Sequence, residues 1–148
     1  KKKIFIFLIF TFELVYKLKI YHPYQSLYLN NLVSESTKSK YEADYQSLSR
    51  VDAIKEILND SPKKNITIAT ASWTPLKNGI SLIFPNNNPN IKFIGTANKE
   101  KADYIYSNYF YEIDPRYNKK YNIPNNFYLF KSLYIDGIKV YSIYKKTS

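Results

Sequence analysis

The chain of 148 residues allows one domain with an appendage, and 45% hydrophobic with 18% aromatic residues is enough for a packed core. It contains no cysteine, which excludes disulfides, cysteine-ligated zinc and thiol nucleophiles. The net charge of +10 comes almost wholly from lysine, which reads phosphate and guanine geometry less well than arginine does. A basic surface of this kind suits membrane lipid headgroups or lipid-linked phosphate, and we disfavour nucleic acid as a partner.

The first residues combine a cationic flank with an apolar run. Lys1–Lys3 precede the uncharged segment Ile4–Phe12, and apolar side chains continue to Ile20. This pattern predicts a transmembrane or membrane-associated helix over residues 1–20, about 25 Å long against a hydrocarbon core of roughly 30 Å. Glu13 would cost about 2.5 to 3.5 kcal/mol at the centre of a spanning helix unless other helices surround it.

Three interpretations of this helix compete. They are the last transmembrane helix of a multi-pass protein, a cleavable signal peptide, and an amphipathic interfacial helix, ranked in that order. A signal peptide requires small residues for cleavage after the apolar run, and the segment from Glu13 to Lys17 offers none. The chain also has no methionine, even at position 1, which predicts that it is part of a longer protein.

Residues 21–40 are expected to be an interfacial connector. Pro23 prevents continuation of the helix, and Tyr21, Tyr24 and Tyr28 carry the side chain that favours a membrane–water boundary. We expect the polar, aperiodic residues 32–40 to form a loop. The positive flank at the N-terminus would place residues 21–148 on the extracytoplasmic side of the membrane.

Residues 41–148 show the pattern of a soluble α/β domain. The predicted fold class is α/β, with the N-terminal helix followed by a small α/β sandwich that has a mostly parallel sheet and a C-terminal antiparallel hairpin. Asp136-Gly137 between two alternating runs predicts a type I′ turn that pairs Ile135 with Ile138 and Leu133 with Val140. The expected elements are a helix over 50–58 capped by Ser49, a strand over 64–70, a helix from Thr74-Pro75 to about 84, a strand over 91–94, a turn or helical stub over 98–101, a strand over 102–107, and strands over 128–135 and 138–145.

The segments around the connector resemble the C-terminal part of bacterial multi-pass glycosyltransferases of the family 39-like group, which use polyprenyl-phosphate sugars. The resemblance rests on His22-Pro23-Tyr24-Gln25 and on Tyr41-Glu42 with Asp44-Tyr45. It also rests on the C-terminal pair of strands that Asp136-Gly137 joins. It implies a last transmembrane helix followed by a small α/β domain. The chain departs from the family at Gln46-Ser47 and at residues 32–40, and the family's catalytic carboxylates lie in an early loop outside this chain.

Few side chains are candidates for chemistry. Glu42 and Asp44, two residues apart, would point the same way from an extended segment, as a cation or an acid–base pair requires, although such carboxylates more often pair with lysine or a helix N-terminus. His22 could move a proton or contact a phosphate, yet beside a proline it more often caps a helix end. Ala71-Ser72-Trp73 follows a buried strand, where open α/β sheets place ligands, but lacks the glycines of a phosphate cradle.

These observations lead to two functional hypotheses. The first is a non-catalytic extracytoplasmic C-terminal domain of an integral-membrane glycosyltransferase, with membrane lipid, the rest of the protein and a polyprenyl-phosphate-linked sugar as partners. We assign it no catalytic, cofactor-binding or metal-ligating residue and no cofactor. The alternative is a stand-alone basic α/β binding module for a membrane surface or nucleic acid. A soluble α/β enzyme is disfavoured because no nucleophile–base pair or metal set is recognisable.

Overall fold

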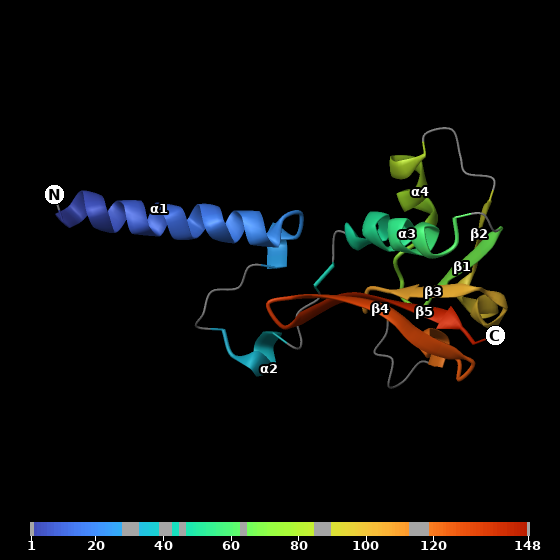
Figure 1. The fold of residues 1–148 in the computed structure, drawn as a ribbon. Coiled ribbons are helices and arrows are strands. Elements are labelled where there is room, and N and C mark those ends of the chain that lie inside the picture. The colour runs from blue at the N-terminus through green and yellow to red at the C-terminus, as the bar shows by residue number, and fades with distance from the viewer. Residues whose placement is uncertain are drawn as a thin grey trace. The chain divides into compact units, whose positions relative to one another are not determined.

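The computed structural model describes residues 2–27, 33–38, 43–44, 47–62, 65–84, 90–112 and 119–147 (Figure 1). The chain divides into two compact units, Lys1–Tyr41 and Glu42–Ser148. We describe each unit separately.

The N-terminal unit is built on one long helix. Helix α1 spans Lys2–Tyr21, which confirms the helix predicted over residues 1–20, and a 3-10 turn, η1, follows at Gln25–Leu27. A short helix, α2, spans Glu35–Lys38, within the segment that the sequence predicted to be a loop. It begins directly after Ser34, whose hydroxyl accepts a hydrogen bond from the Thr37 backbone N–H at 3.3 Å. A serine at that position stabilises the first turn of a helix, which explains the difference.

Helix α1 exposes its apolar side chains, from Ile4, 65% exposed, to Phe12, 75% exposed, and on to Ile20, 51% exposed. Within the described ranges, no helix has both the length and the apolar character needed to cross a membrane. Tyr21 and Tyr24 are each only 2% exposed, so the structure buries two of the rings that we expected at headgroup level. Tyr28 lies outside the described residues.

The second unit contains a mixed five-stranded sheet. Its strands are β1 (Ile66–Thr70), β2 (Ile91–Ile94), β3 (Tyr104–Ser107), β4 (Phe127–Ile135) and β5 (Ile138–Lys146), and their order is β2-β1-β3-β5-β4. Strand β1 pairs in parallel with β2 and with β3, whereas β5 is antiparallel to both β3 and β4. The α/β class and the C-terminal hairpin are therefore confirmed, and the parallel part of the sheet is confined to one end.

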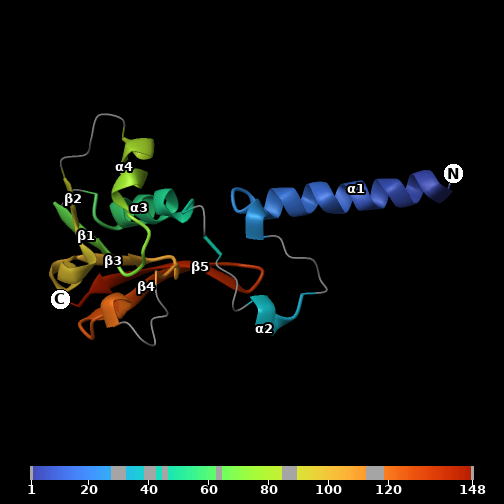
Figure 2. The same cartoon turned by 180° about the vertical axis from the view of Figure 1, so that it is seen from behind.

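Two helices lie on one face of the sheet, as Figures 1 and 2 show. They are α3 (Ser49–Asp60) and α4 (Lys77–Ile83). Helix α3 buries Ala53, Ile54 and Ile57 completely. It packs closely on α4 because Gly79 has no side chain: a Cβ atom there would lie 3.0 Å from the Arg50 Cβ atom.

The opposite face of the parallel strands carries a second hydrophobic cluster. Ala69 of β1 and Ile105 of β3 are buried there with Phe127, and Ile123 and Tyr144 pack against them. Side chains alternate between the two faces of a strand, so β1 and β3 contribute to both layers of the core. This explains the near-continuous apolar character of their sequences.

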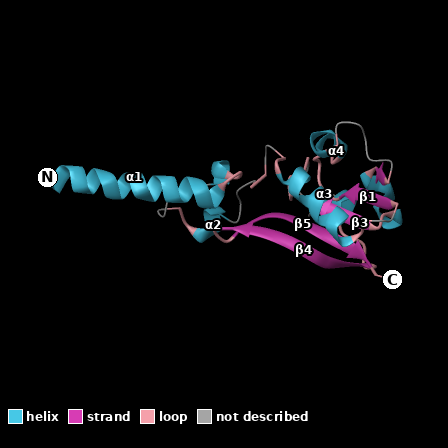
Figure 3. Cartoon of the chain, turned by 45° about the horizontal axis from the view of Figure 1, so that its top comes forward, coloured by secondary structure: helices cyan, strands magenta, loops and turns pink. Residues whose placement is uncertain are grey.

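The C-terminal hairpin is a long ribbon, visible in Figure 3. Asp136 and Gly137 both have positive φ values, 50° and 76°, as a type I′ turn requires, and Ile135 pairs with Ile138 as predicted. The predicted pairing of Leu133 with Val140 is wrong, because the register shifts by one residue and Leu133 lies opposite Tyr141. Such a bulge changes which side chains share a face.

Candidate functional site

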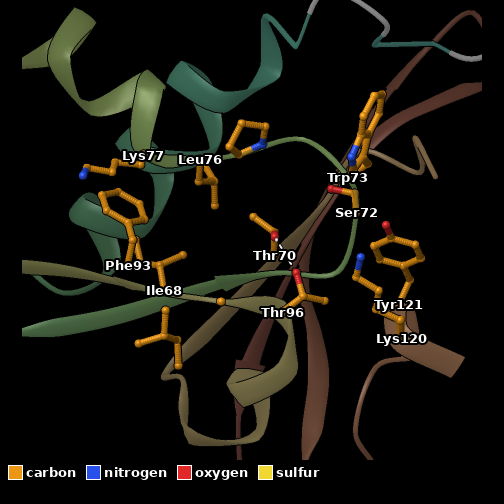
Figure 4. A pocket seen from close by; sticks show the side chains of 13 residues that line it. Ile68, Thr70, Ser72, Trp73, Leu76, Lys77, Phe93, Thr96, Lys120 and Tyr121 are labelled. Atoms are coloured by element: carbon orange, nitrogen blue, oxygen red, sulfur yellow. Dashed lines mark hydrogen bonds between the residues drawn. The ribbon is translucent and has the colours of Figure 1, made fainter. Parts of the chain in front are cut away.

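A cleft lies at the carboxyl ends of β1 and β2 (Figure 4). Three segments form it: the loop from Ala71 to Leu76 after β1, the residues Gly95 and Thr96 after β2, and the 3-10 turn η3 (Lys119–Tyr121). The volume of the cleft is about 390 Å³, within the range of small-molecule sites. Open α/β sheets bind their ligands at this edge, so the fold provides the expected position for a site.

The side chains that line the cleft are hydroxylated, cationic or apolar. Among the lining residues that the structure describes, none carries a carboxylate. The hydroxyls of Thr70 and Thr96 are 3.2 Å apart and satisfy each other. The hydroxyls come from Thr70, Ser72, Thr96 and Tyr121, the ammonium groups from Lys77 and Lys120, and the aromatic surfaces from Trp73, Phe93 and Tyr121.

Two of these hydroxyls are buried without a hydrogen bond. Ser72 is 2% exposed and Tyr121 is 3% exposed, and neither the Ser72 Oγ nor the Tyr121 Oη has a partner in the part of the chain that the structure describes. In Figure 4 both oxygen atoms lie in the region of the cleft next to Trp73. An unsatisfied buried polar group costs about 1 to 3 kcal/mol, so two of them at one cleft indicate a position where a bound molecule supplies the missing partners.

Lysines next to the η3 turn give the cleft a positive rim. The Lys120 Nζ lies 5.2 Å from the centroid of the Tyr121 ring and 3.4 Å from a Glu112 carboxylate oxygen. The neighbouring Tyr121 hydroxyl, and to a lesser extent Glu112, raise the pKa of Lys120, although the Tyr121 hydroxyl does not reach hydrogen-bond geometry. Lys99 donates a hydrogen bond from its Nζ to the Lys120 carbonyl at 2.7 Å, which fixes the turn.

Asp44, a candidate from the sequence, belongs to a separate buried network. It is 3% exposed, and its carboxylate accepts hydrogen bonds from the Ser49 Oγ at 2.7 Å, the Ser49 backbone N–H at 3.2 Å and the Asn108 amide at 3.1 Å. Burial, together with the Asp44 charge, raises the pKa of Tyr106 well above its ordinary value, so this phenol stays protonated and donates. Asp44 therefore joins the first residue of α3 to the end of β3.

This network also corrects two predicted caps. Ser49 is the first residue of α3, not its N-cap, and its hydroxyl bonds Asp44 and Tyr106. Thr74 does not cap α4, which begins at Lys77; its hydroxyl instead accepts a hydrogen bond from Asn108 at 2.8 Å. Thr74 therefore holds the loop after β1 against the end of β3, and Ser49 holds the start of α3 against Tyr106 of β3.

The other sequence candidates lie elsewhere. The His22 side chain is exposed, and its Nδ1 is 2.9 Å from the Gln25 Nε2. Glu42 lies outside the described residues, so the predicted pairing of its carboxylate with Asp44 stays a prediction. No group of three or more histidine, aspartate or glutamate side chains suitable for a metal ion occurs within the described ranges.

The position of Ser72 and Trp73 after a buried strand indicated this edge of the sheet from the sequence. Lys120 and Tyr121, which reach the same cleft from η3, were not among the predicted residues. The available signal was weak: these residues fall in a long connection rich in tyrosine and lysine, whose return to the sheet edge depends on the hairpin that follows.

The fold and cleft define a small α/β domain with a mixed sheet and a hydroxyl-lined site at the carboxyl edge of its parallel strands. Comparison with protein-family models, with curated proteins and with solved structures finds no match to this chain.

Proposed function

We propose that this chain is the membrane-associated, non-catalytic C-terminal part of an integral-membrane glycosyltransferase that uses a polyprenyl-phosphate sugar. In this proposal α1 packs among other helices of the same membrane protein, and the α/β unit lies on the extracytoplasmic side. The single observation that carries the proposal is the surface of α1.

Between Ile4 and Phe10 that surface is apolar on every side. Successive residues of an α-helix are rotated by about 100°, so the unbroken run from Ile4 to Phe10 places apolar side chains around the whole circumference. Each of them is between 51% and 69% exposed. A helix on the surface of a soluble domain has one apolar stripe, whereas a helix that is apolar all round requires cover on all sides. Lipid and neighbouring membrane helices provide that cover.

The charged residues of α1 favour helices over lipid alone as the cover. Glu13 follows the apolar run, and Lys17 and Lys19 follow Glu13. A carboxylate is costly in hydrocarbon and is tolerated where other helices offer a partner. This agrees with the resemblance to multi-pass glycosyltransferases.

The hydrogen bonding of the Asp44 carboxylate favours a supporting role for the α/β unit over a catalytic one. Asp44 belongs to one of the segments that resemble the glycosyltransferases. Both oxygen atoms of Asp44 accept hydrogen bonds inside the α/β unit. A buried carboxylate engaged in this way stabilises a fold and is not presented to a substrate. We assign the unit the role of covering or organising the sugar-acceptor side of the membrane-embedded site.

Membrane association is tested by placing charges on α1. The double substitution Ile6→Lys with Phe10→Lys removes about 3 to 6 kcal/mol of apolar burial, and we expect the 148-residue chain, expressed without the rest of the membrane protein, to move from the carbonate-resistant membrane fraction to the soluble fraction. The matched control is Leu82→Lys, because Leu82 is an apolar side chain of α4 that is 71% exposed. The control should stay in the membrane. Equal membrane retention of the α1 variant would contradict the proposal.

Topology is tested with a reporter fused after Ser148 in the complete protein. We expect activity outside the cytoplasm, and cytoplasmic activity would exclude the proposed placement. The alternative is a basic binding module. It predicts that the chain binds anionic vesicles in a steeply salt-dependent manner even when it carries Ile6→Lys and Phe10→Lys. That result would favour the alternative over the glycosyltransferase domain.

A further inference from the structure

The geometry points to the cleft at the ends of β1 and β2 as a binding site for an acidic monosaccharide unit, a hydroxylated ring that carries a carboxylate or a phosphate. This site is independent of the proposed function, since every residue that forms it belongs to the α/β unit. Loss of membrane association and loss of ligand binding are therefore separate outcomes.

The unsatisfied hydroxyls indicate a ligand with several hydrogen-bonding groups. Within the described residues the buried Ser72 Oγ and Tyr121 Oη have no hydrogen-bond partner, and a hydrogen-bonding group bound in the cleft beside them would supply one. A hydroxyl can donate and accept, and so can each hydroxyl of a sugar.

The remaining wall suits the carbon face of a sugar ring. Trp73 is 56% exposed at the rim, and its ring lies 5.5 Å from that of Phe110, which supports its orientation. Phe93 and Leu76 line the apolar part of the cleft. Small-molecule sites combine such apolar and aromatic walls with a few polar groups that fix orientation, and that is the composition found here.

The charge pattern indicates that the sugar is acidic. Lys77 and Lys120 both line the cleft, and none of its described lining residues is a carboxylate that would oppose an anion. The ion pair between Lys120 and Glu112 is exposed, since the two side chains are 45% and 50% exposed, and solvent screens the attraction between them. A ligand anion can therefore take the place of Glu112 beside Lys120.

The protein contains its own reporter for this test. Trp73 is the single tryptophan of the chain and lies in the wall of the cleft. The full chain in detergent micelles is titrated with glucuronate, glucose 6-phosphate, glucose and inorganic phosphate while the tryptophan fluorescence is followed. We expect a saturable change with glucuronate, with glucose 6-phosphate or with both, which identifies the acidic group, and at least about tenfold weaker binding of glucose and of inorganic phosphate.

Three results would overturn the inference: no saturable change with either acidic sugar, binding of glucose as tight as that of the acidic sugars, or binding of inorganic phosphate as tight as that of glucose 6-phosphate. The last two would show a site that recognises only one half of the proposed ligand.

Variants tie the signal to the cleft. Ser72→Ala should weaken binding between about twofold and tenfold, the loss expected for one hydrogen bond. The double substitution Lys77→Gln with Lys120→Gln should weaken it by about tenfold or more. Its matched control is Lys92→Gln with Lys119→Gln, which changes the net charge equally at exposed lysines outside the cleft. Equal loss in the control would show unspecific attraction and reject the site, and so would unaltered binding in both cleft variants.

Discussion

Replacement of two buried serines should change the stability of the α/β unit in opposite directions. Ser72 and Ser107 are each 2% exposed, at the ends of the neighbouring strands β1 and β3. The Ser107 Oγ donates a hydrogen bond to the Ala71 carbonyl at 3.0 Å and accepts one from the Tyr109 backbone N–H at 3.3 Å. The Ser72 Oγ has no such partner among the described residues. The two serines therefore differ in hydrogen bonding at equal burial.

The magnitudes follow from this difference. Ser107→Ala loses two buried hydrogen bonds at about 0.5 to 1.5 kcal/mol each, a total of about 1 to 3 kcal/mol. For a unit of this size 1 kcal/mol corresponds to about 4 °C, so its Tm should fall by about 4 to 12 °C. Ser72→Ala removes an unsatisfied hydroxyl and loses no hydrogen bond, so it should raise the Tm by about 4 °C.

Thermal unfolding of the full chain should be followed by the fluorescence of Trp73, which reports on the α/β unit and not on α1. A fall in Tm for Ser72→Ala that equals the fall for Ser107→Ala would refute the reasoning, because it would show that the Ser72 hydroxyl has a stabilising partner in the free protein. It would also remove the main support for the sugar site.

Three further predictions concern the packing and the buried polar groups. Asp44→Ala should lower the free energy of unfolding in urea by about 3 to 6 kcal/mol, because the Ser49 backbone N–H and the Asn108 amide each lose a hydrogen bond to a charged group at about 1.5 to 3 kcal/mol. Gly79→Ala should destabilise the unit by about 1 to 3 kcal/mol through overpacking between α3 and α4, whereas Gly95→Ala, with no atom within 4 Å of the new Cβ, should change stability by less than about 0.5 kcal/mol in the same assay. Burial, together with hydrogen bonding, raises the pKa of Tyr144 to about 12 from 10, so its stabilising contribution is complete below pH 10 and lost as the pH rises through 12; urea midpoints across this range should decline less steeply in Tyr144→Phe.

Elements with a strong local pattern could be predicted from the sequence. Strand β2 begins at Ile91 and ends at Ile94 as expected, and the Asp136-Gly137 turn has the backbone that its residues favour. Each of these depends on neighbouring residues alone. The pairing beyond the turn could not be predicted, because a bulge adds an unpaired residue to one strand and the residues of the turn do not encode it.

The roles of polar side chains were harder to predict, because their partners are distant in sequence. For Asp44 the sequence favoured lysine or a helix N-terminus over a cation shared with Glu42; the carboxylate accepts hydrogen bonds from Ser49, the first residue of α3, and also from Asn108 after β3, which no local pattern indicates. Thr74 has the sequence context of a helix cap, but Asn108 is near enough to compete for its hydroxyl. The prediction of a helix N-cap considers only the backbone N–H groups of the residues that follow Thr74. In the folded chain the Asn108 amide, directly after β3, bonds the Thr74 hydroxyl instead.

The same network explains how the cleft keeps an open wall. Asn108 holds the Thr74 hydroxyl, and the Phe110 carbonyl accepts a hydrogen bond from the Trp73 backbone N–H at 2.9 Å, so the loop after β1 is tied to β3 on one side. On the other side of Ser72, the Ala71 backbone N–H donates a hydrogen bond to the Tyr106 carbonyl at 2.7 Å, so Ser72 lies between two anchored residues, and its hydroxyl has no partner among the described residues. The chain thus fixes the residues on each side of Ser72 while leaving its hydroxyl unsatisfied, an arrangement that costs stability in the free protein and becomes favourable once a hydrogen-bonding ligand occupies the cleft.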